Sequence, residues 1–290
     1  MPCFPLLIAA ILIAAAPAFA QAPLGQAPAY SQRALTPVPN APAMTRLIWV
    51  PGIDDGYVPQ GLTYLGGALF VSSYLSTSIL QDRGPCRLYR INPGTGAVTG
   101  QMDLPSTCGH AGGIAKGRRG HIVVADTRII FEIALDQGAG IGRVTRSAKL
   151  TGQVKGSFAA GAADGLWLGA YERDGSSRIF KFLWKTLGKE TLGEADAAAS
   201  LPLPERAQGA AFDEAGRLWI MSSGSRSGEL ARLDSAGAVE ARYAMPAGSE
   251  DISFEPGGAL WSLSEAGSRR WSGWATHFPV IFRLDVKKLR

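Results

Sequence analysis

Few side chains in this sequence are suited to proton transfer or metal binding. Of the three histidines, His110 and His277 stand in polar, turn-rich stretches, where an imidazole can serve as a base or a ligand. Glu250 is a carboxylate suited to a general acid or to a hard cation such as Ca²⁺. We therefore take His110 and Glu250 as the catalytic candidates, and Glu250 also as the candidate metal ligand. No G-x-S-x-G elbow, phosphate loop or dinucleotide fingerprint accompanies them.

Several similar short segments along the chain each begin with a polar residue. The segments "QGLTY", "SFAAG", "QGAAF" and "EDISF" begin with Gln60, Ser157, Gln208 and Glu250. Asp251 follows Glu250, and the neighbouring pair Asp54 and Asp55 precedes the first segment. A ring of such side chains would bind a small polar ligand or a divalent cation. The alternative is a water-filled channel mouth.

An aromatic and basic loop near the C-terminus is a candidate contact surface. The stretch "SRRWSGWATHF" brings Trp271, Trp274 and His277 together with two arginines. Tryptophan stacks on sugars and cations, and both Trp and Arg are favoured at interfaces. Two interpretations stay open: a binding loop, or a loop that buries its own tryptophans.

The elements that must position these residues form an internal repeat. The segments "ALFVSSY", "HIVVADT", "GLWLGAY", "RLWIMSS" and "ALWSLSE" are similar, and their central residues recur every 42–53 residues. A short strand precedes each one, a third follows, and most units have a fourth. This period with four short strands is typical of an all-β fold, the β-propeller. We expect five four-stranded blades, with six as the alternative, and large aromatics packed between them.

Closure of the ring follows from a missing strand. The fifth unit ends at "VIFRLDVKKLR" without its fourth strand, whereas residues 46–51 form an orphan strand before the first unit. We expect this N-terminal strand to pair with residues 279–285, since closure removes exposed strand edges. The up-and-down strand order then brings the starts of the first strands and the ends of the second strands to one face. We expect Asp54 and Asp55 to reach the channel mouth there, near His110 and Glu250.

The N-terminus and the cysteines indicate an exported protein. An apolar run followed by "AFA" at 18–20 is typical of a signal peptide, residues 1–20. Residues 21–43 contain five prolines and are predicted to be a flexible leader, so that residues 44–290 form one propeller domain. Two cysteines then remain, and an oxidising compartment favours a disulfide between Cys86 and Cys108 over two free thiols. We expect a periplasmic or secreted protein with no transmembrane segment.

The segments "RLYRINPGTGAV" and "PQGLTY" give the chain a family resemblance. It resembles the extracytoplasmic propellers of the YVTN/NHL and gluconolactonase-like kind over residues 45–290, and more loosely the plant-type glutaminyl cyclases. The resemblance to metal-dependent lactonases implies that Glu250 would match their first ligand. Their asparagine ligands are absent here, because Asn40 and Asn92 lie in the leader and in a turn on the opposite face.

These patterns predict binding of a small molecule, glycan or protein at the loop-bearing face. The alternatives are a metal-assisted hydrolase, lactonase or lyase at the channel mouth, or glutaminyl cyclase-like acyl transfer. A net charge of +5 without a basic stripe argues against nucleic acid as the partner.

Overall fold

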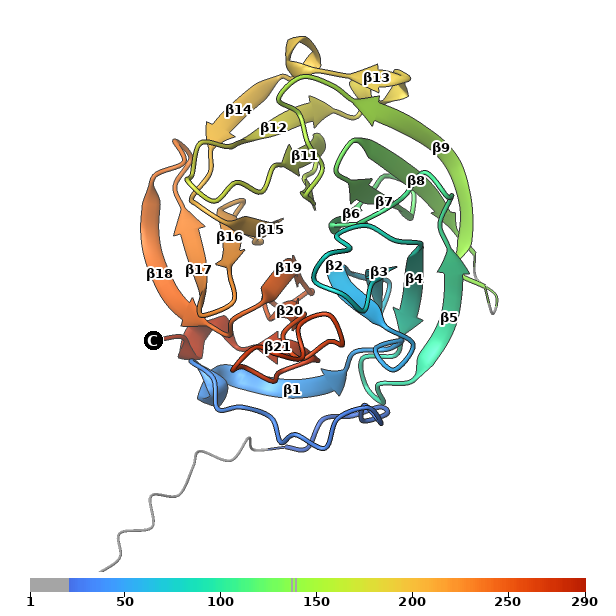
Figure 1. The fold of residues 1–290 in the computed structure, drawn as a ribbon. Coiled ribbons are helices and arrows are strands. Elements are labelled where there is room, and N and C mark those ends of the chain that lie inside the picture. The colour runs from blue at the N-terminus through green and yellow to red at the C-terminus, as the bar shows by residue number, and fades with distance from the viewer. Residues whose placement is uncertain (1–20, 137, 139) are drawn as a thin grey trace, which may run out of the picture.

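Five antiparallel sheets surround a central axis in the computed structural model, which describes residues 21–136, 138 and 140–290 (Figure 1). The prediction of five blades is confirmed, and the alternative of six is wrong. The predicted signal peptide, residues 1–20, lies outside the described residues.

Blades 1 to 4 follow one another along the chain, each beginning with its innermost strand. Blade 1 consists of β2 (Tyr57–Leu65), β3 (Ala68–Leu75), β4 (Cys86–Ile91) and β5 (Val98–Asp103). Blade 2 consists of β6 (Gly113–Lys116), β7 (His121–Asp126), β8 (Ile129–Leu135) and β9 (Gly142–Leu150). Blade 3 consists of β10 (Phe158–Gly161), β11 (Gly165–Gly169), β12 (Arg178–Leu183) and β14 (Ala199–Pro202). Blade 4 consists of β15 (Ala207–Phe212), β16 (Leu218–Ser223), β17 (Gly228–Leu233) and β18 (Val239–Met245).

Blade 5 is built from both ends of the chain. It consists of β19 (Ser249–Phe254), β20 (Leu260–Ser264), β21 (Val280–Leu284) and the N-terminal β1 (Met44–Trp49). β1 pairs antiparallel with β21, with Leu47 opposite Phe282 and Trp49 opposite Val280. The predicted closure of the ring is therefore confirmed. It leaves β21 with a hydrogen-bonded neighbour on both sides.

The remaining elements are short. β13 (Thr191–Leu192) adds a parallel fifth strand to blade 2 beside β9. Four single-turn 3-10 helices complete the described chain: η1 (Ala41–Ala43), η2 (Thr186–Gly188), η3 (Glu194–Asp196) and η4 (Val286–Lys288). No helix in the described ranges is both long and apolar enough to span a membrane.

Burial explains the strand pattern of the sequence. The second strands are enclosed on both faces, as in β16 and β20, where every residue is buried. The outer strands β5 and β18 alternate towards solvent, as one-sided strands do. Five apolar clusters fill the spaces between neighbouring blades, and the repeated positions Phe70, Val123, Trp167, Trp219 and Trp261 all belong to them. The predicted packing role of these residues is confirmed.

The innermost strands approach each other very closely at the axis. A Cβ atom added at Gly209 would lie 2.5 Å from the Cα of Asp251, so only glycine fits there. The buried Asp251 carboxylate accepts backbone N–H groups from Leu62 in blade 1 (3.0 Å) and Ile114 in blade 2 (2.9 Å). Burial raises the pKa of Asp251, while these N–H groups oppose the shift. Asp251 thus joins three blades below the channel mouth.

The segment before β1 lies against the propeller. Leu24 exchanges backbone hydrogen bonds with Leu47 and Trp49 of β1, and Thr36 bonds the backbone of His277. The proline-rich composition predicts a flexible leader, whereas the structure holds the segment along blade 5. We call residues 21–43 the N-terminal strap. Its backbone groups and Arg33 make contacts that composition does not encode.

Candidate functional site

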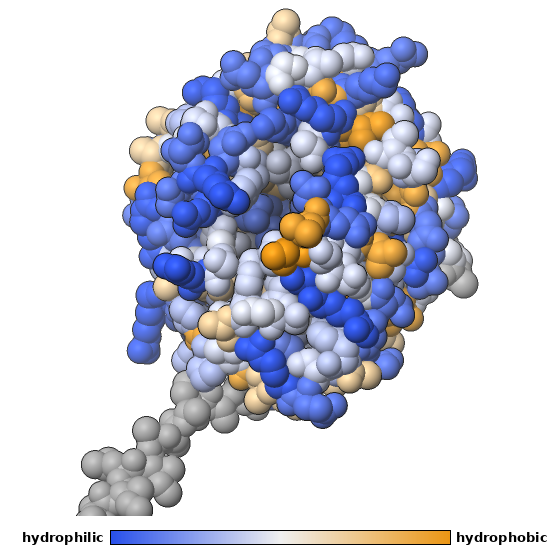
Figure 2. Space-filling view, viewed as in Figure 1, coloured by the Kyte–Doolittle hydropathy of each residue, from blue (hydrophilic) through white to orange (hydrophobic). Residues whose placement is uncertain are grey.

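A polar cavity of about 1030 Å³ opens at the axis, on the face where the innermost strands begin and the second strands end. Figure 2 shows it as the hollow at the centre of the propeller. Its wall comes from all five blades, since each contributes a loop or the start of an inner strand. A volume near 1000 Å³ is at the upper end of the range of small-molecule sites.

The repeat alignment predicts several residues of this wall. Gln60, Ser157 and Gln208 line the cavity at the starts of blades 1, 3 and 4, and His110 lines it before blade 2. Glu250 lies just behind the wall and is 1% exposed. Glu265, which follows β20 in the same blade, reaches the cavity in its place. Glu265 was not among the site residues predicted from the sequence, although its position just after a second strand was a signal for this face.

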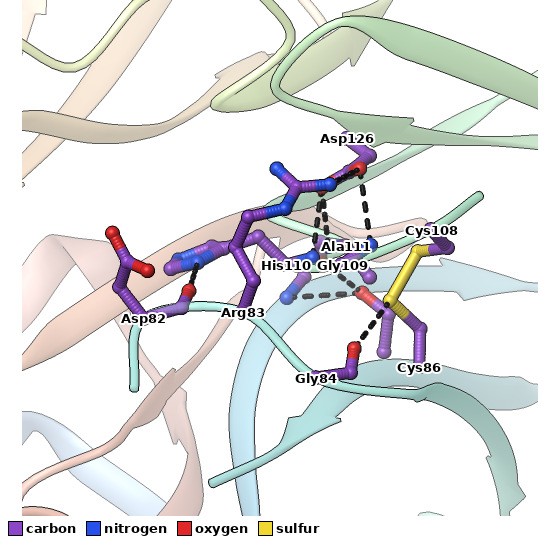
Figure 3. Close-up of a disulfide and its surroundings, with 11 residues drawn as sticks. Asp82, Arg83, Gly84, Cys86, Cys108, Gly109, His110, Ala111 and Asp126 are labelled. Carbon is purple, nitrogen blue, oxygen red and sulfur yellow. Dashed lines mark hydrogen bonds and ion pairs between the residues drawn. A yellow bond between two sulfur atoms is a disulfide. The ribbon is translucent and has the colours of Figure 1, made fainter. Parts of the chain in front are cut away.

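The turn that carries His110 is fixed by a disulfide and a buried carboxylate (Figure 3). Cys86 at the start of β4 is bonded to Cys108, with a Cα–Cα distance of 5.9 Å, so the predicted disulfide is confirmed. Asp126 at the end of β7 accepts the backbone N–H groups of Gly109 (3.1 Å), His110 (2.8 Å) and Ala111 (3.1 Å). Asp126 also pairs with Arg83 at 3.1 Å.

Backbone strain accompanies this arrangement. Ala111 has a φ of 50° and Arg206 a φ of 56°, both in the left-handed region that residues other than glycine seldom adopt. Arg206 stands directly before the inner strand β15 and lines the cavity, and Ala111 lies two residues before β6, between the cavity-lining His110 and Gly112. Strained non-glycine residues persist where surrounding contacts over-determine them, which is a feature of binding and catalytic sites.

His110 begins a chain of hydrogen bonds across the cavity floor. Its Nδ1 lies 2.8 Å from the Asp82 carbonyl oxygen, and its Nε2 lies 2.8 Å from Oε1 of Gln60. The Gln60 amide nitrogen donates to the Pro59 carbonyl oxygen and to Oε2 of Glu265, at 2.8 and 2.9 Å. Both imidazole nitrogens thus face oxygen atoms, and a neutral ring can donate to only one of them. Burial lowers the pKa of His110, which keeps a basic nitrogen at this floor near neutral pH.

Glu250 and Glu265 form a buried carboxyl pair beside this chain. Their side chains are hydrogen-bonded to each other, and Gln208 donates to Glu250 at 3.1 Å. Glu265 also accepts from Nε1 of Trp271 at 2.7 Å. Burial raises the pKa of Glu265 to about 7, and burial together with the Glu265 charge raises that of Glu250. Buried carboxyl groups with raised pKa values are suited to general acid–base chemistry at neutral pH.

Three arginines line the side of the cavity that blades 3 and 4 form. Arg173, Arg206 and Arg226 come from the loops of blades 3 and 4, line the cavity and are exposed. Within the described ranges none of the three has a carboxylate at ion-pair distance, whereas Lys155 pairs with Glu172 at 2.5 Å. None of the three arginines was among the site residues predicted from the sequence. Basic residues far apart in sequence give no recognisable motif.

The aromatic loop 265–278 forms another part of the wall. Trp271 and Trp274 line the cavity and are stacked, with ring centroids 4.6 Å apart. Arg270 lies over the Trp271 ring, with its guanidinium carbon 4.5 Å from the ring centroid. The two interpretations of this loop are therefore partly combined: the tryptophans pack on each other and still face the cavity.

The other candidate residues lie away from the cavity. The Asp54 carboxylate accepts the backbone N–H groups of Ala29 and Tyr30 in the N-terminal strap, and Asp55 is exposed. The turn at 51–56 thus meets the strap and not the channel mouth. His277 is 1% exposed beneath the strap, and burial lowers its pKa. In the described chain no cluster of three or more His, Cys, Asp or Glu side chains is arranged to hold a metal ion, so no third side chain of these types completes a metal site around Glu250 and Glu265.

Comparisons with known proteins show likeness of fold. No protein-family model and no curated protein matches the sequence. The calcium-binding protein regucalcin from Agrobacterium tumefaciens is 17% identical, with 79% of this chain and 93% of that chain covered and a TM-score of 0.49. A virginiamycin B lyase from Staphylococcus aureus is 16% identical over 77% and 82%, with a TM-score of 0.41. A putative gluconolactonase is 15% identical over 72% of each chain, with a TM-score of 0.44.

Proposed function

We propose that this protein binds a small anionic molecule in the central cavity. The observation that carries this proposal is the trio Arg173, Arg206 and Arg226, three exposed arginines that line the cavity without a carboxylate partner in the described chain. Guanidinium groups pair with carboxylates and phosphates in a bidentate manner, so a cluster of unpaired ones suits an anionic group. The mildly basic net charge of +5 would also favour the approach of an anion.

The proposal is tested by titrating the purified protein with inorganic phosphate and with succinate in a calorimeter. The double variant Arg173→Gln, Arg226→Gln should weaken the binding of both anions at least about tenfold, since each charge-assisted hydrogen bond contributes about 1.5–3 kcal/mol. Arg143→Gln is the matched control, because Arg143 is exposed on the outer strand β9, outside the cavity. Equal affinity in the double variant and the control, or no binding to the unmodified protein, would overturn the proposal.

A catalytic role is the second candidate, and a different observation favours it. The buried pair Glu250 and Glu265 has raised pKa values beside the basic nitrogen of His110. Such a group suits a hydrolase or lyase that moves protons without a resident metal. Turnover of a chromogenic ester or an aryl lactone in metal-free buffer, lost in Glu265→Gln, would support this role. Turnover that only returns with added Ca²⁺ would favour the metal-assisted alternative.

We also propose that the protein is exported to the periplasm or the medium. The Cys86–Cys108 disulfide supports this location, because disulfides persist in oxidising compartments. The signal-peptide pattern of residues 1–20 supports it independently. N-terminal sequencing of the protein recovered from the periplasm or the medium tests this directly, and we expect cleavage after Ala20.

A further inference from the structure

We infer that the ligand of the central cavity is amphiphilic: an anionic group joined to an aromatic or hydrocarbon part. This inference rests on the proposed anion binding and adds the chemistry of the rest of the ligand. It follows from the two unlike sides of the cavity. Arginines from blades 3 and 4 line one side, and the stacked tryptophans of blade 5 line the other, next to an exposed apolar loop of blade 1.

The apolar side includes the most exposed large hydrophobic side chains of the described residues. Leu80 is 91% exposed and Ile79 is 67% exposed, both in the loop between β3 and β4. The other two such side chains, Val98 and Val239, are 47% and 37% exposed and lie on the outer strands β5 and β18. Exposed leucine and isoleucine side by side are unfavourable in water unless something covers them.

The loop that carries these side chains lies at the mouth of the cavity. Asp82 and Arg83 of the same loop line the cavity, and Asp82 bonds His110 through its carbonyl oxygen. Figure 2 shows an apolar patch at the rim of the hollow, over the region where Figure 1 draws the blade 1 loops. The exposed pair is thus next to the cavity and not on a remote surface.

Arg270 joins the loop between β3 and β4 to the aromatic loop of blade 5. Its guanidinium donates to the carbonyl oxygens of Ser78 (2.6 Å) and Ile79 (3.4 Å), and it lies over the Trp271 ring. Trp271 in turn is stacked with Trp274. The two tryptophans form the apolar wall of the cavity, and the backbone of the loop that carries Ile79 and Leu80 is bonded to the same arginine.

The opposite wall has the complementary chemistry. Arg173, Arg206 and Arg226 come from the β11–β12, β14–β15 and β16–β17 connections, in blades 3 and 4. Figure 2 shows strongly hydrophilic side chains on the side of the hollow away from the apolar patch. A wholly polar anion would leave the apolar wall exposed to water, whereas an amphiphilic anion satisfies both walls at once. A whole molecule of this kind fits a cavity of about 1030 Å³.

The test compares four probes that separate charge from apolar surface. They are acetate, 1-naphthoate, the neutral 1-naphthalenemethanol and the cationic 1-naphthylmethylamine, each titrated by calorimetry. We expect 1-naphthoate to bind about tenfold or more tightly than each of the other three, because it alone has both parts. In the double variant Ile79→Ser, Leu80→Ser, the affinity for 1-naphthoate should fall about tenfold while that for acetate stays unchanged. Val239→Ser, which removes an exposed valine from β18, is the matched control and should change neither affinity.

The outcomes distinguish this inference from the anion binding on which it rests. If phosphate and acetate bind but the naphthyl group adds nothing, the amphiphilic ligand is wrong and anion binding stands. If no anion binds, both are wrong. Preference for the neutral or the cationic naphthyl probe overturns the inference as well. One further outcome would replace the amphiphilic ligand with a membrane surface. In that outcome 1-naphthoate does not bind, and the unmodified protein sediments with phosphatidylglycerol vesicles whereas the Ile79→Ser, Leu80→Ser variant does not.

Discussion

At the scale of single residues, Glu265 links several parts of the site. It accepts hydrogen bonds from Gln60 and Trp271 and is hydrogen-bonded to the side chain of Glu250. Asp126 performs a different task, since it holds three successive N–H groups of the turn that carries His110. Burial therefore raises the pKa of one carboxyl group, Glu265, while the other, Asp126, positions the neighbouring base.

The raised pKa of Glu265 predicts a pH dependence of stability. Between the ordinary value of 4.5 and about 7, the folded protein keeps a proton on Glu265 that the unfolded chain releases. The free energy of unfolding should therefore fall, by about 1–3 kcal/mol, as the pH rises from 5 to 8. Urea unfolding at both pH values should show a smaller fall in Glu265→Gln and an unchanged fall in Glu190→Gln, which alters an exposed carboxylate. An equal fall in all three proteins would contradict the raised pKa.

At the scale of elements, the N-terminal strap supports the aromatic loop. The Arg33 guanidinium donates to the carbonyl oxygens of Ser272, Trp274 and Ala275, and the Tyr30 hydroxyl donates to that of Gly267. Asp54, at the turn before blade 1, holds the strap from the other side. A segment outside the blades thus positions the loop that bears Trp271 and Trp274.

Removing Arg33 should loosen this loop. In Arg33→Ala the three carbonyl groups lose their donor, so we expect about 1 kcal/mol lower stability and faster cleavage by trypsin after Arg269, which is exposed. Limited proteolysis followed by mass spectrometry locates the cleavage. Arg143→Ala, on the outer strand β9, should be cleaved as slowly as the unmodified protein. The supporting role of the strap is refuted if both variants resist trypsin equally.

At the scale of the whole molecule, the N-terminal strand closes the ring. β1 gives β21 its outer partner and contributes Leu47 and Ile48 to the apolar clusters on the two sides of blade 5. Without β1 the last blade would keep an open edge and lose buried apolar surface.

Two truncations test the closure. A variant without residues 21–43 should lose about 1–3 kcal/mol, because it gives up the strap's hydrogen bonds. A variant without residues 21–50 should lose several kcal/mol more, a large part of an ordinary stability of about 5–15 kcal/mol. Chemical unfolding of both variants measures the difference. Similar stability of the two would mean that β1 does not hold the ring.

The sequence by itself determined the propeller fold, with five blades preferred to six, and predicted the closing strand, the disulfide and three cavity-lining positions of the repeat. These follow from local patterns: the period of the buried strands, the missing strand of the fifth unit, and two cysteines after a signal-like segment. Gln60, Ser157 and Gln208 line the cavity because equivalent positions of a repeat occupy equivalent places around the axis.

Only the tertiary structure decided which side chains meet. Gln60 and Glu265 are far apart in the chain and bond because closure sets blade 5 beside blade 1. The three unpaired arginines come from three separate loops, and no periodicity records where a loop side chain points. Asp54 turns to the strap because the strap's N–H groups lie there, although its composition predicts flexibility. Repeat spacing encodes the position of a strand, whereas contacts between loops depend on the packing of the whole ring.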